Sequence, residues 1–170
     1  MSSDAEKISA LFRDFEVSAF RLEVQQTYRI PAEQERLANF LAGQAKPVRD
    51  TSWHQNVAAK VASGKDMRRA KIVRRPLTDY TRFLIAWGIP DNVRAGERYR
   101  IVDLTDRQLD LPEHDFWFFD DKSVVVLDFA PDGTLRNREL FDKPDLGQYR
   151  YWRDLAWSNG ISFDEWDAGT

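Results

Sequence analysis

The spacing of apolar residues predicts that the chain begins with a helix followed by a strand. In residues 8–15, apolar side chains recur every three or four positions, which is typical of a helix with one buried face. From Ser18 to Ile30, apolar and polar residues alternate, with Phe20 on one side and Arg21 on the other. This period of two predicts a half-buried strand, because successive strand side chains point to opposite faces of a sheet.

Three helices and a short strand are predicted in the middle of the chain. The helices span Pro31–Gly43, Thr51–Gly64 and Thr78–Gly88, and each combines an apolar stripe with a start signal and a glycine at its end. Between the last two, Lys71–Arg74 is typical of a short buried strand. Residues 90–96 are expected to form one helical turn or a loop.

The second half of the chain predicts most of the sheet. Strands are expected at Glu97–Leu104, Phe116–Phe119, Ser123–Phe129 and Thr134–Leu140, and Asp145 opens a final helix. Tight turns join the last three strands into an antiparallel meander. The order of elements predicts a single α/β domain over residues 1–170, with helices packed on a mixed sheet and a core at about residues 8–160. The polar N-terminus and the acidic C-terminal tail lie outside that core.

The aromatic strand Phe116–Phe119 leaves two arrangements open. Phe116 and Phe118 point to one face of the sheet, so Trp117 and Phe119 must point to the other. Either helices cover both faces, or an aromatic surface remains for a ligand or a partner. We expect helices on both faces.

Composition and charge narrow the function classes. The 170 residues include no cysteine, which excludes disulfides, thiolate metal sites and cysteine nucleophiles and fits a reducing compartment. No apolar run approaches the length of a membrane span and residues 1–9 are polar, so we expect a cytoplasmic protein that does not bind a membrane. The net charge of −3 and the pI of about 5.5 argue against direct DNA binding.

Groups that could carry chemistry are few. The two histidines, His54 and His114, stand in no metal-ligand spacing, and the chain has no GxSxG elbow, GxxxxGK[ST] loop or GxGxxG loop. Asp120 and Asp121 could hold a divalent cation, but aspartates also favour turns such as the one predicted there. We therefore predict no catalytic residue, no metal ligand and no cofactor.

The strongest charge feature is a basic stretch at residues 60–75, which holds seven Lys and Arg residues and a single acidic residue. Such a stretch could bind phosphate, nucleic acid or an acidic protein surface, or it could be the solvated flank of a helix and a strand. With the aromatic strand and its turn, it supplies the candidate ligand- or partner-binding residues. These are Arg68, Arg69, Arg74, Arg75, Trp117, Asp120 and Asp121.

Three segments carry a resemblance to a known family. They are the run from Gly64 to Tyr80, which contains MRRAKIVRRPLTDY, the triplet Ala95–Gly96–Glu97, and DFWFFDD at Asp115–Asp121. With them the chain resembles an actinobacterial domain-of-unknown-function family from about Phe12 to Trp166. Members of that family are commonly encoded beside helix-turn-helix regulators, so the resemblance implies such a regulator as a partner.

A second resemblance concerns the order of elements. A basic strand, a helix, a second strand, an aromatic strand and a Val-rich strand are similar to phospholipase D-like domains attached to bacterial transcription regulators, which implies a phospholipase D-like half-domain. Catalytic members of that superfamily carry His-x-Lys followed by Asp, whereas His114 is followed here by Asp115 and Phe116. The departure implies a degenerate, non-hydrolytic domain that senses a ligand or pairs with another chain.

Two functions follow as hypotheses. The first is a non-catalytic regulatory or sensor module that acts with a helix-turn-helix regulator or binds a small anionic ligand. The alternative is a metal-dependent phosphodiesterase or nuclease-like enzyme, in which the basic stretch binds substrate and Asp120 and Asp121 hold the metal ion.

Overall fold

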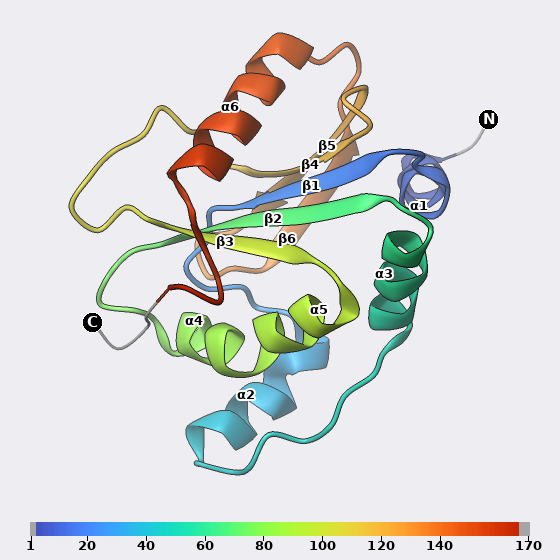
Figure 1. Cartoon of the computed structure of the whole chain (residues 1–170). Helices are drawn as coiled ribbons and strands as arrows, with labels where there is room; N and C mark the ends of the chain where they lie inside the picture. Colours follow the sequence, from blue (N-terminus) through green and yellow to red (C-terminus); the bar gives the residue numbers. More distant parts are fainter. Residues whose placement is uncertain (1–2, 167–170) are drawn as a thin grey trace.

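The computed structural model describes residues 3–166 and contains a seven-stranded mixed sheet with helices on both faces (Figure 1). The strands are β1 (Ser18–Glu23), β2 (Asp66–Val73), β3 (Arg98–Asp103), β4 (Asp115–Phe119), β5 (Ser123–Phe129), β6 (Leu135–Leu140) and β7 (Ile161–Ser162). Their order across the sheet is β6–β5–β4–β1–β2–β3–β7. The predicted α/β fold class, with its antiparallel meander near the C-terminus, is confirmed.

The helices lie between and after the strands. They are α1 (Asp4–Asp14), the 3-10 turn η1 (Pro31–Glu33), α2 (Gln34–Leu41), α3 (Ser52–Ala62), α4 (Asp79–Phe83), the π-helix η2 (Leu84–Gly88), α5 (Ile89–Ala95) and α6 (Leu146–Asn159). Within residues 3–166 no helix is both long and apolar enough to cross a membrane.

Three central strands run parallel, so their carboxyl ends lie on the same side of the sheet. β1 pairs with β2, and β2 with β3, both in parallel. Each crossover passes through helices, as parallel strands require. β4 pairs antiparallel with β1 and begins the β4–β5–β6 meander, and β7 pairs antiparallel with β3 at the other edge. The carboxyl ends of β1, β2 and β3 therefore meet beside the loop of residues 104–114.

Helices cover both faces of the sheet, as expected. On one face, Tyr149 and Ala156 of α6 pack on a buried cluster that includes Phe20 and Phe116. On the other face, α1 and α3 cover Trp117, and the α4–η2–α5 helix covers the end of the sheet near β3. Every residue of β4 is buried, because both sides of this aromatic strand have helical cover.

The helix that begins after Thr78 is longer than its sequence predicts. The expected end at Gly88 is wrong, because Gly88 keeps right-handed helical angles and the chain continues through η2 into α5. A side chain at Gly88 would meet Leu84 Cδ1 at 2.8 Å, so the glycine serves close packing rather than termination. The helix ends at Gly96, whose φ of +119° is open to glycine and rare for other residues.

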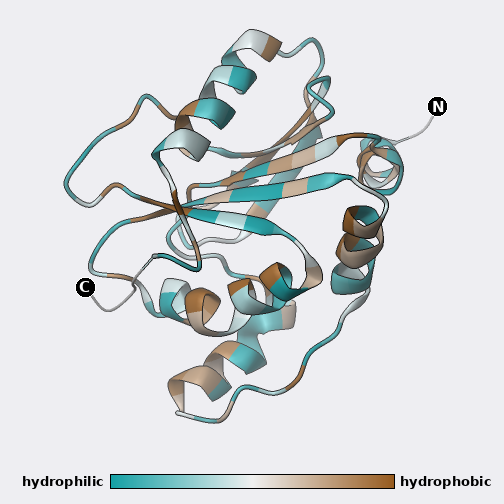
Figure 2. Cartoon of the chain, viewed as in Figure 1, coloured by the Kyte–Doolittle hydropathy of each residue, from teal (hydrophilic) through white to brown (hydrophobic). Residues whose placement is uncertain are grey.

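The first two strands also differ from their predicted bounds. The strand predicted over Ser18–Ile30 ends at Glu23, and the one predicted at Lys71–Arg74 begins at Asp66. The prediction of a half-buried first strand is wrong, because Glu23 is 4% exposed and Arg21 has little exposure. Figure 2 shows hydrophilic residues within β2 and β3 in the middle of the sheet. The alternation in the first strand predicts that Arg21 and Glu23 face solvent, but both have little exposure.

Candidate functional site

The structure separates the basic residues of the predicted site. Arg68 and Arg69 are adjacent in β2, so their side chains leave on opposite faces of the sheet. Arg69 lines a cavity on the face that α1 and α3 cover, whereas the Arg68 guanidinium lies over the Trp157 ring of α6. Arg74 and Arg75 follow the end of β2, where Arg75 donates a hydrogen bond to Asp103. The seven predicted residues therefore do not form one surface.

Asp120 serves the β4–β5 turn, where its φ is +53°. Its carboxylate accepts hydrogen bonds of 2.7–2.9 Å from the backbone N–H groups of Glu16, Val17 and Ser18. Partial burial raises the pKa of Asp120, but these three donors outweigh it, and the net pKa is lowered. The carboxylate thus anchors the start of β1 to the turn.

Asp121, the next residue of the turn, has its carboxylate directed to α6. It pairs with Arg153 and lies 3.8 Å from Arg150. Because both turn carboxylates are bound to other groups of the fold, the geometry does not favour them as a joint metal site. Within residues 3–166 no group of three or more His, Cys, Asp or Glu side chains is arranged to hold a metal ion.

A cavity of about 480 Å³ lies on the face of the sheet opposite α6, and we call it the sheet-face cavity. The central strands form its floor, and α1, α3, α5 and the segments around α2 form its walls. It brings Arg69 and Trp117 of the predicted site together with residues that the prediction missed. The lining residues that matter below are Arg21, Glu23, Tyr28, Trp53, His54, Arg69, Asn92, Tyr99 and Trp117.

One buried ion pair underlies the cavity. Arg21 Nη2 donates to Asp115 Oδ2 over 2.7 Å, and the Asp115 side chain is fully buried. Asp115 also accepts a 2.6 Å hydrogen bond from the Tyr28 hydroxyl and a 2.8 Å bond from the Val24 N–H. Burial by itself lowers the pKa of Arg21. The nearby charges of Asp115 and Glu23 have the larger effect, so the net pKa of Arg21 is raised.

A second ionic group centres on Arg69. Its Nε donates to Glu97 Oε1 at 3.0 Å, and its Nη1 donates to Glu23 Oε1 at 3.3 Å. Burial raises the pKa of Glu97, although Arg69 acts in the opposite direction. Burial also acts to raise the pKa of Glu23, but Arg69 and Arg21 have the larger effect and lower it. Of the two carboxylates that bind Arg69, Glu23 is therefore the one held more strongly in its charged form.

The charges of the two groups balance. The three cations Arg21, Arg69 and Lys71 face the three carboxylates Glu23, Glu97 and Asp115. Burial lowers the pKa of Lys71, whose ammonium donates to the carbonyl of Gln25. Because the carboxylates already have cationic partners, a ligand would be held by groups that remain unused rather than by excess charge.

Aromatic rings surround the Arg69 guanidinium. Its central carbon lies 5.0 Å from the centroid of Trp117, 5.4 Å from that of Trp53 and 5.7 Å from that of Tyr99. These distances are within the range of cation–π attraction, which holds both the cation and the rings in place. The cavity is therefore walled by aromatic side chains with fixed positions.

Two buried donors of the lining residues have no hydrogen-bond partner among the described residues. They are Arg21 Nε and the indole Nε1 of Trp53. A buried N–H without an acceptor costs free energy, and most native donors have a partner. An oxygen-bearing ligand could supply the missing acceptors.

His54 is fully engaged at the wall of the cavity. Its Nδ1 accepts from the N–H of Thr51 at 3.1 Å, and its Nε2 lies 3.0 Å from Asn92 Oδ1. Asn92 Nδ2 in turn lies 3.1 Å from the hydroxyl of Tyr99. This arrangement leaves neither ring nitrogen of His54 for a substrate.

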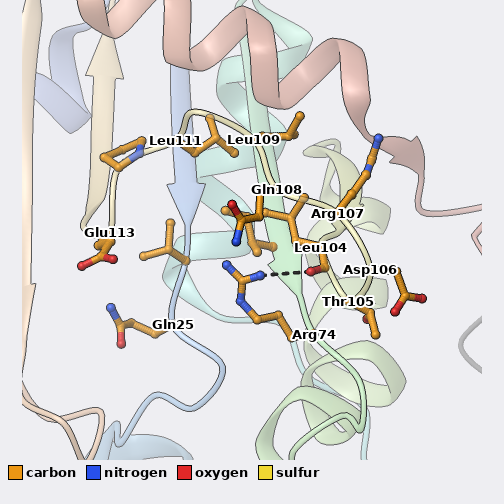
Figure 3. Close-up of a pocket in the computed structure, with 13 residues that line it drawn as sticks. Gln25, Arg74, Leu104, Thr105, Asp106, Arg107, Gln108, Leu109, Leu111 and Glu113 are labelled. Carbon is orange, nitrogen blue, oxygen red and sulfur yellow. Dashed lines mark hydrogen bonds between the residues drawn. The ribbon is translucent and has the colours of Figure 1, made fainter.

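A larger cleft of about 1000 Å³ lies at the carboxyl ends of β1, β2 and β3. Figure 3 shows Arg74 directed toward the loop of residues 104–113, where its Nη1 donates to the Leu104 carbonyl at 3.2 Å. Arg107 turns away to donate to the carbonyl of Asn159 at 2.8 Å. Clefts at the carboxyl ends of parallel strands commonly bind ligands, but this one has no buried charged network.

The sequence contained a signal for the buried network, which the strand prediction missed. Arg21 and Glu23 alternate with apolar residues and were therefore read as facing solvent. An all-aromatic neighbouring strand needs cover on both faces, and that cover also buries the charged positions of β1. Asp115, which begins this aromatic strand, is fully buried, and it is not among the candidate residues that the sequence predicts.

Comparisons with known proteins locate the chain in a family. A search of curated proteins gives no match. Among solved structures, the chain is similar to the phospholipase D family member Nuc from Salmonella typhimurium, with 12% identity and a TM-score of 0.48 over 92% of this chain and 89% of that chain. A similarity at this level supports no argument about substrate or catalysis. The family DUF6879 matches residues 6–168, so the chain belongs to this family, whose description is a domain of unknown function.

Proposed function

We propose that the domain is a non-catalytic sensor that binds a small organic ligand in the sheet-face cavity. The observation that carries the proposal is a cavity walled by aromatic rings, two of whose lining residues, Arg21 and Trp53, each have a buried N–H donor without a partner among the described residues. Its volume of about 480 Å³ lies within the usual range of ligand pockets, about 300–1,000 Å³.

The lining favours a ligand with an aromatic or apolar body and one acceptor group, such as a carboxylate. Aromatic side chains would contact the body, and the two free N–H groups would bind the oxygens. A negative charge on the ligand agrees with the donor character of both groups. The small anionic ligand expected from the sequence thus finds a specific location in this proposal.

The absence of a catalytic role rests on how the polar groups are used. Arg69 binds Glu23, Asp115 binds Arg21, and both nitrogens of His54 are engaged. A general acid or base must reach a substrate proton, and these groups are occupied by the fold. Because Asp120 and Asp121 are bound in the same way, nothing in their geometry favours the alternative of a metal-dependent phosphodiesterase.

The partner in this proposal is a helix-turn-helix regulator. Support comes from the resemblance that Gly64–Tyr80 and Asp115–Asp121 carry, because that resemblance implies such a regulator as a partner. Ligand binding in the cavity would change the affinity of the domain for the regulator, and linkage requires the regulator to change ligand affinity by the same factor.

Ligand binding is tested by calorimetry and thermal unfolding with benzoate, salicylate and indole-3-acetate as probes. We expect at least one probe to raise the melting temperature and to bind saturably. Trp53→Phe keeps a ring but removes the indole donor, so it should weaken that probe about 3- to 10-fold. Trp152→Phe is the matched control, since Trp152 packs on the opposite face with α6.

Two results would overturn the sensor proposal. One is the failure of all three probes to bind at millimolar concentration, and the other is equal affinity in wild type and Trp53→Phe. Hydrolysis of phosphodiesters in the presence of Mg²⁺ or Mn²⁺, lost in Asp121→Ala, would support the enzyme instead. For the partner, co-expression with a neighbouring regulator should yield a complex whose stability changes with the bound probe.

A further inference from the structure

Three arginines surround the ring of Trp157 on the face of the sheet that α6 covers. The guanidinium carbons of Arg100, Arg68 and Arg98 lie 4.6, 4.9 and 5.4 Å from the ring centroid. Arg68 and Arg98 are directly opposite each other in the β2–β3 pair, and Arg100 follows on the same face. We call these four residues the Trp157 arginine cluster.

The cluster holds more positive than negative charge. Asp66 is shared, because it pairs with both Arg68 at 3.0 Å and Arg98 at 2.7 Å. Arg100 donates to the backbone carbonyl of Trp157 at 2.8 Å, and no carboxylate among the described residues forms an ion pair with it. Three guanidiniums thus have one carboxylate between them.

Crowding of these cations is unfavourable in the domain alone. Like charges directly opposite in a sheet destabilise it, and Arg68 and Arg98 occupy such positions. Burial lowers the pKa of Arg68, and Arg153 and Arg98 lower it further against the opposing effects of Asp66 and Asp154. A bound anion would relieve this repulsion and stabilise the cluster.

The cluster is accessible from solvent. The Arg98 side chain is 58% exposed, and Arg100 and Trp157 are partly exposed. It lies on the opposite face of the sheet from the sheet-face cavity, since Arg68 and Arg69 point to opposite sides of β2. The two sites are therefore physically separate and can be tested independently.

We propose that the Trp157 arginine cluster binds a short acidic segment of a partner protein through its carboxylates. Guanidinium groups match carboxylates in geometry and bind them in a bidentate manner. A long nucleic acid is a poorer fit, because the domain as a whole carries a net charge of −3 and repels an extended polyanion. The Trp157 ring is also surrounded by guanidiniums, which leaves little of its face for a stacked base.

The test uses fluorescence anisotropy with a labelled decapeptide of alternating Glu and Ala residues. Wild type should bind it saturably, and Arg98→Gln and Arg100→Gln should each weaken binding by about tenfold, because each removes a charged hydrogen bond. Arg136→Gln is the matched control, since Arg136 is 55% exposed and also pairs with an aspartate. This control should change affinity less than about twofold, as expected for an exposed pair remote from the cluster. Thermal unfolding of each variant verifies that the fold is retained.

Three outcomes would overturn the proposal. The first is that wild type does not bind the peptide at low salt. The second is an equal loss in Arg136→Gln, which would indicate attraction to surface charge in general. The third is that a labelled ten-nucleotide single strand binds more tightly than the peptide and depends on Arg98, which would make nucleic acid the occupant. None of these results depends on the small-ligand probes of the sheet-face cavity.

Discussion

The buried pair of Arg21 and Asp115 gives the sharpest prediction about the stability of this fold. Asp115→Asn keeps the shape of the side chain but removes its charge. The Arg21 side chain, only 11% exposed, would lose its closest anion. The NH2 group of the new amide would also face one of the donors that now bind Asp115, and two donors cannot form a hydrogen bond with each other. Breaking a buried ion pair by removing one partner costs about 3–5 kcal/mol. In a domain of this size that corresponds to a fall in melting temperature of roughly 10 °C.

Urea unfolding followed by tryptophan fluorescence measures this loss. With a slope of about 2 kcal/mol per molar urea, the midpoint should fall by roughly 2 M. Asp128→Asn is the control, because Asp128 forms an ion pair with Arg136 in which both side chains are more than half exposed, and it should have little effect. A double variant that adds Arg21→Met removes the unpaired cation and should be no less stable than Asp115→Asn alone. If Asp115→Asn loses no more stability than Asp128→Asn, the reasoning about buried charge is wrong.

Two further predictions concern the turns. In Gly133→Ala the new Cβ would lie 2.4 Å from the Thr27 carbonyl oxygen at a φ of +89°, so the variant should lose at least about 2 kcal/mol of unfolding free energy. Gly64→Ala, with a φ of +90° and no atom within 4 Å, should lose clearly less, and equal losses would show that the contact is unimportant. Asp120→Asn should cost about 1 kcal/mol at pH 7, since three backbone donors lose a charged acceptor that solvent partly screens. Because the folded-state pKa of Asp120 is lowered, the wild-type advantage should be full above about pH 5 and vanish as the pH falls through that pKa, and an advantage independent of pH would contradict this origin.

Local signals in the sequence predicted most of the elements. Thr51 and Asp145 cap helices where expected, and the β4–β5–β6 meander follows the β-branched and aromatic runs and their turns. The predicted end at Gly88 is wrong because a glycine also occurs where a neighbouring side chain, here Leu84, lies close to the backbone, and sequence cannot separate that role from termination. The strand bounds near Ile30 and Asp66 were inaccurate because pairing with neighbouring strands decides where a strand begins and ends.

The candidate site was less predictable than the fold. The sequence predicts Trp117 and Arg69 as binding residues, and both line the sheet-face cavity. Arg21, Glu23 and Asp115 were not, since alternating charged residues in a strand usually face water. Asp120 and Asp121 had the residue type of a metal site, but only the structure shows that backbone N–H groups and Arg153 bind them.

The sequence by itself determined the α/β class and the covered aromatic strand, because periodicity, capping residues and turn residues act over a few neighbouring positions. Only the tertiary structure decided which charges are buried and which face each other. Arg69 and Glu97 are 28 residues apart, and Arg21 and Asp115 are 94 apart. Such contacts depend on strand order and on which helices cover a face, and no local pattern encodes either. The same strand geometry sends Arg68 and Arg69 to two separate sites, although they are neighbours in the chain.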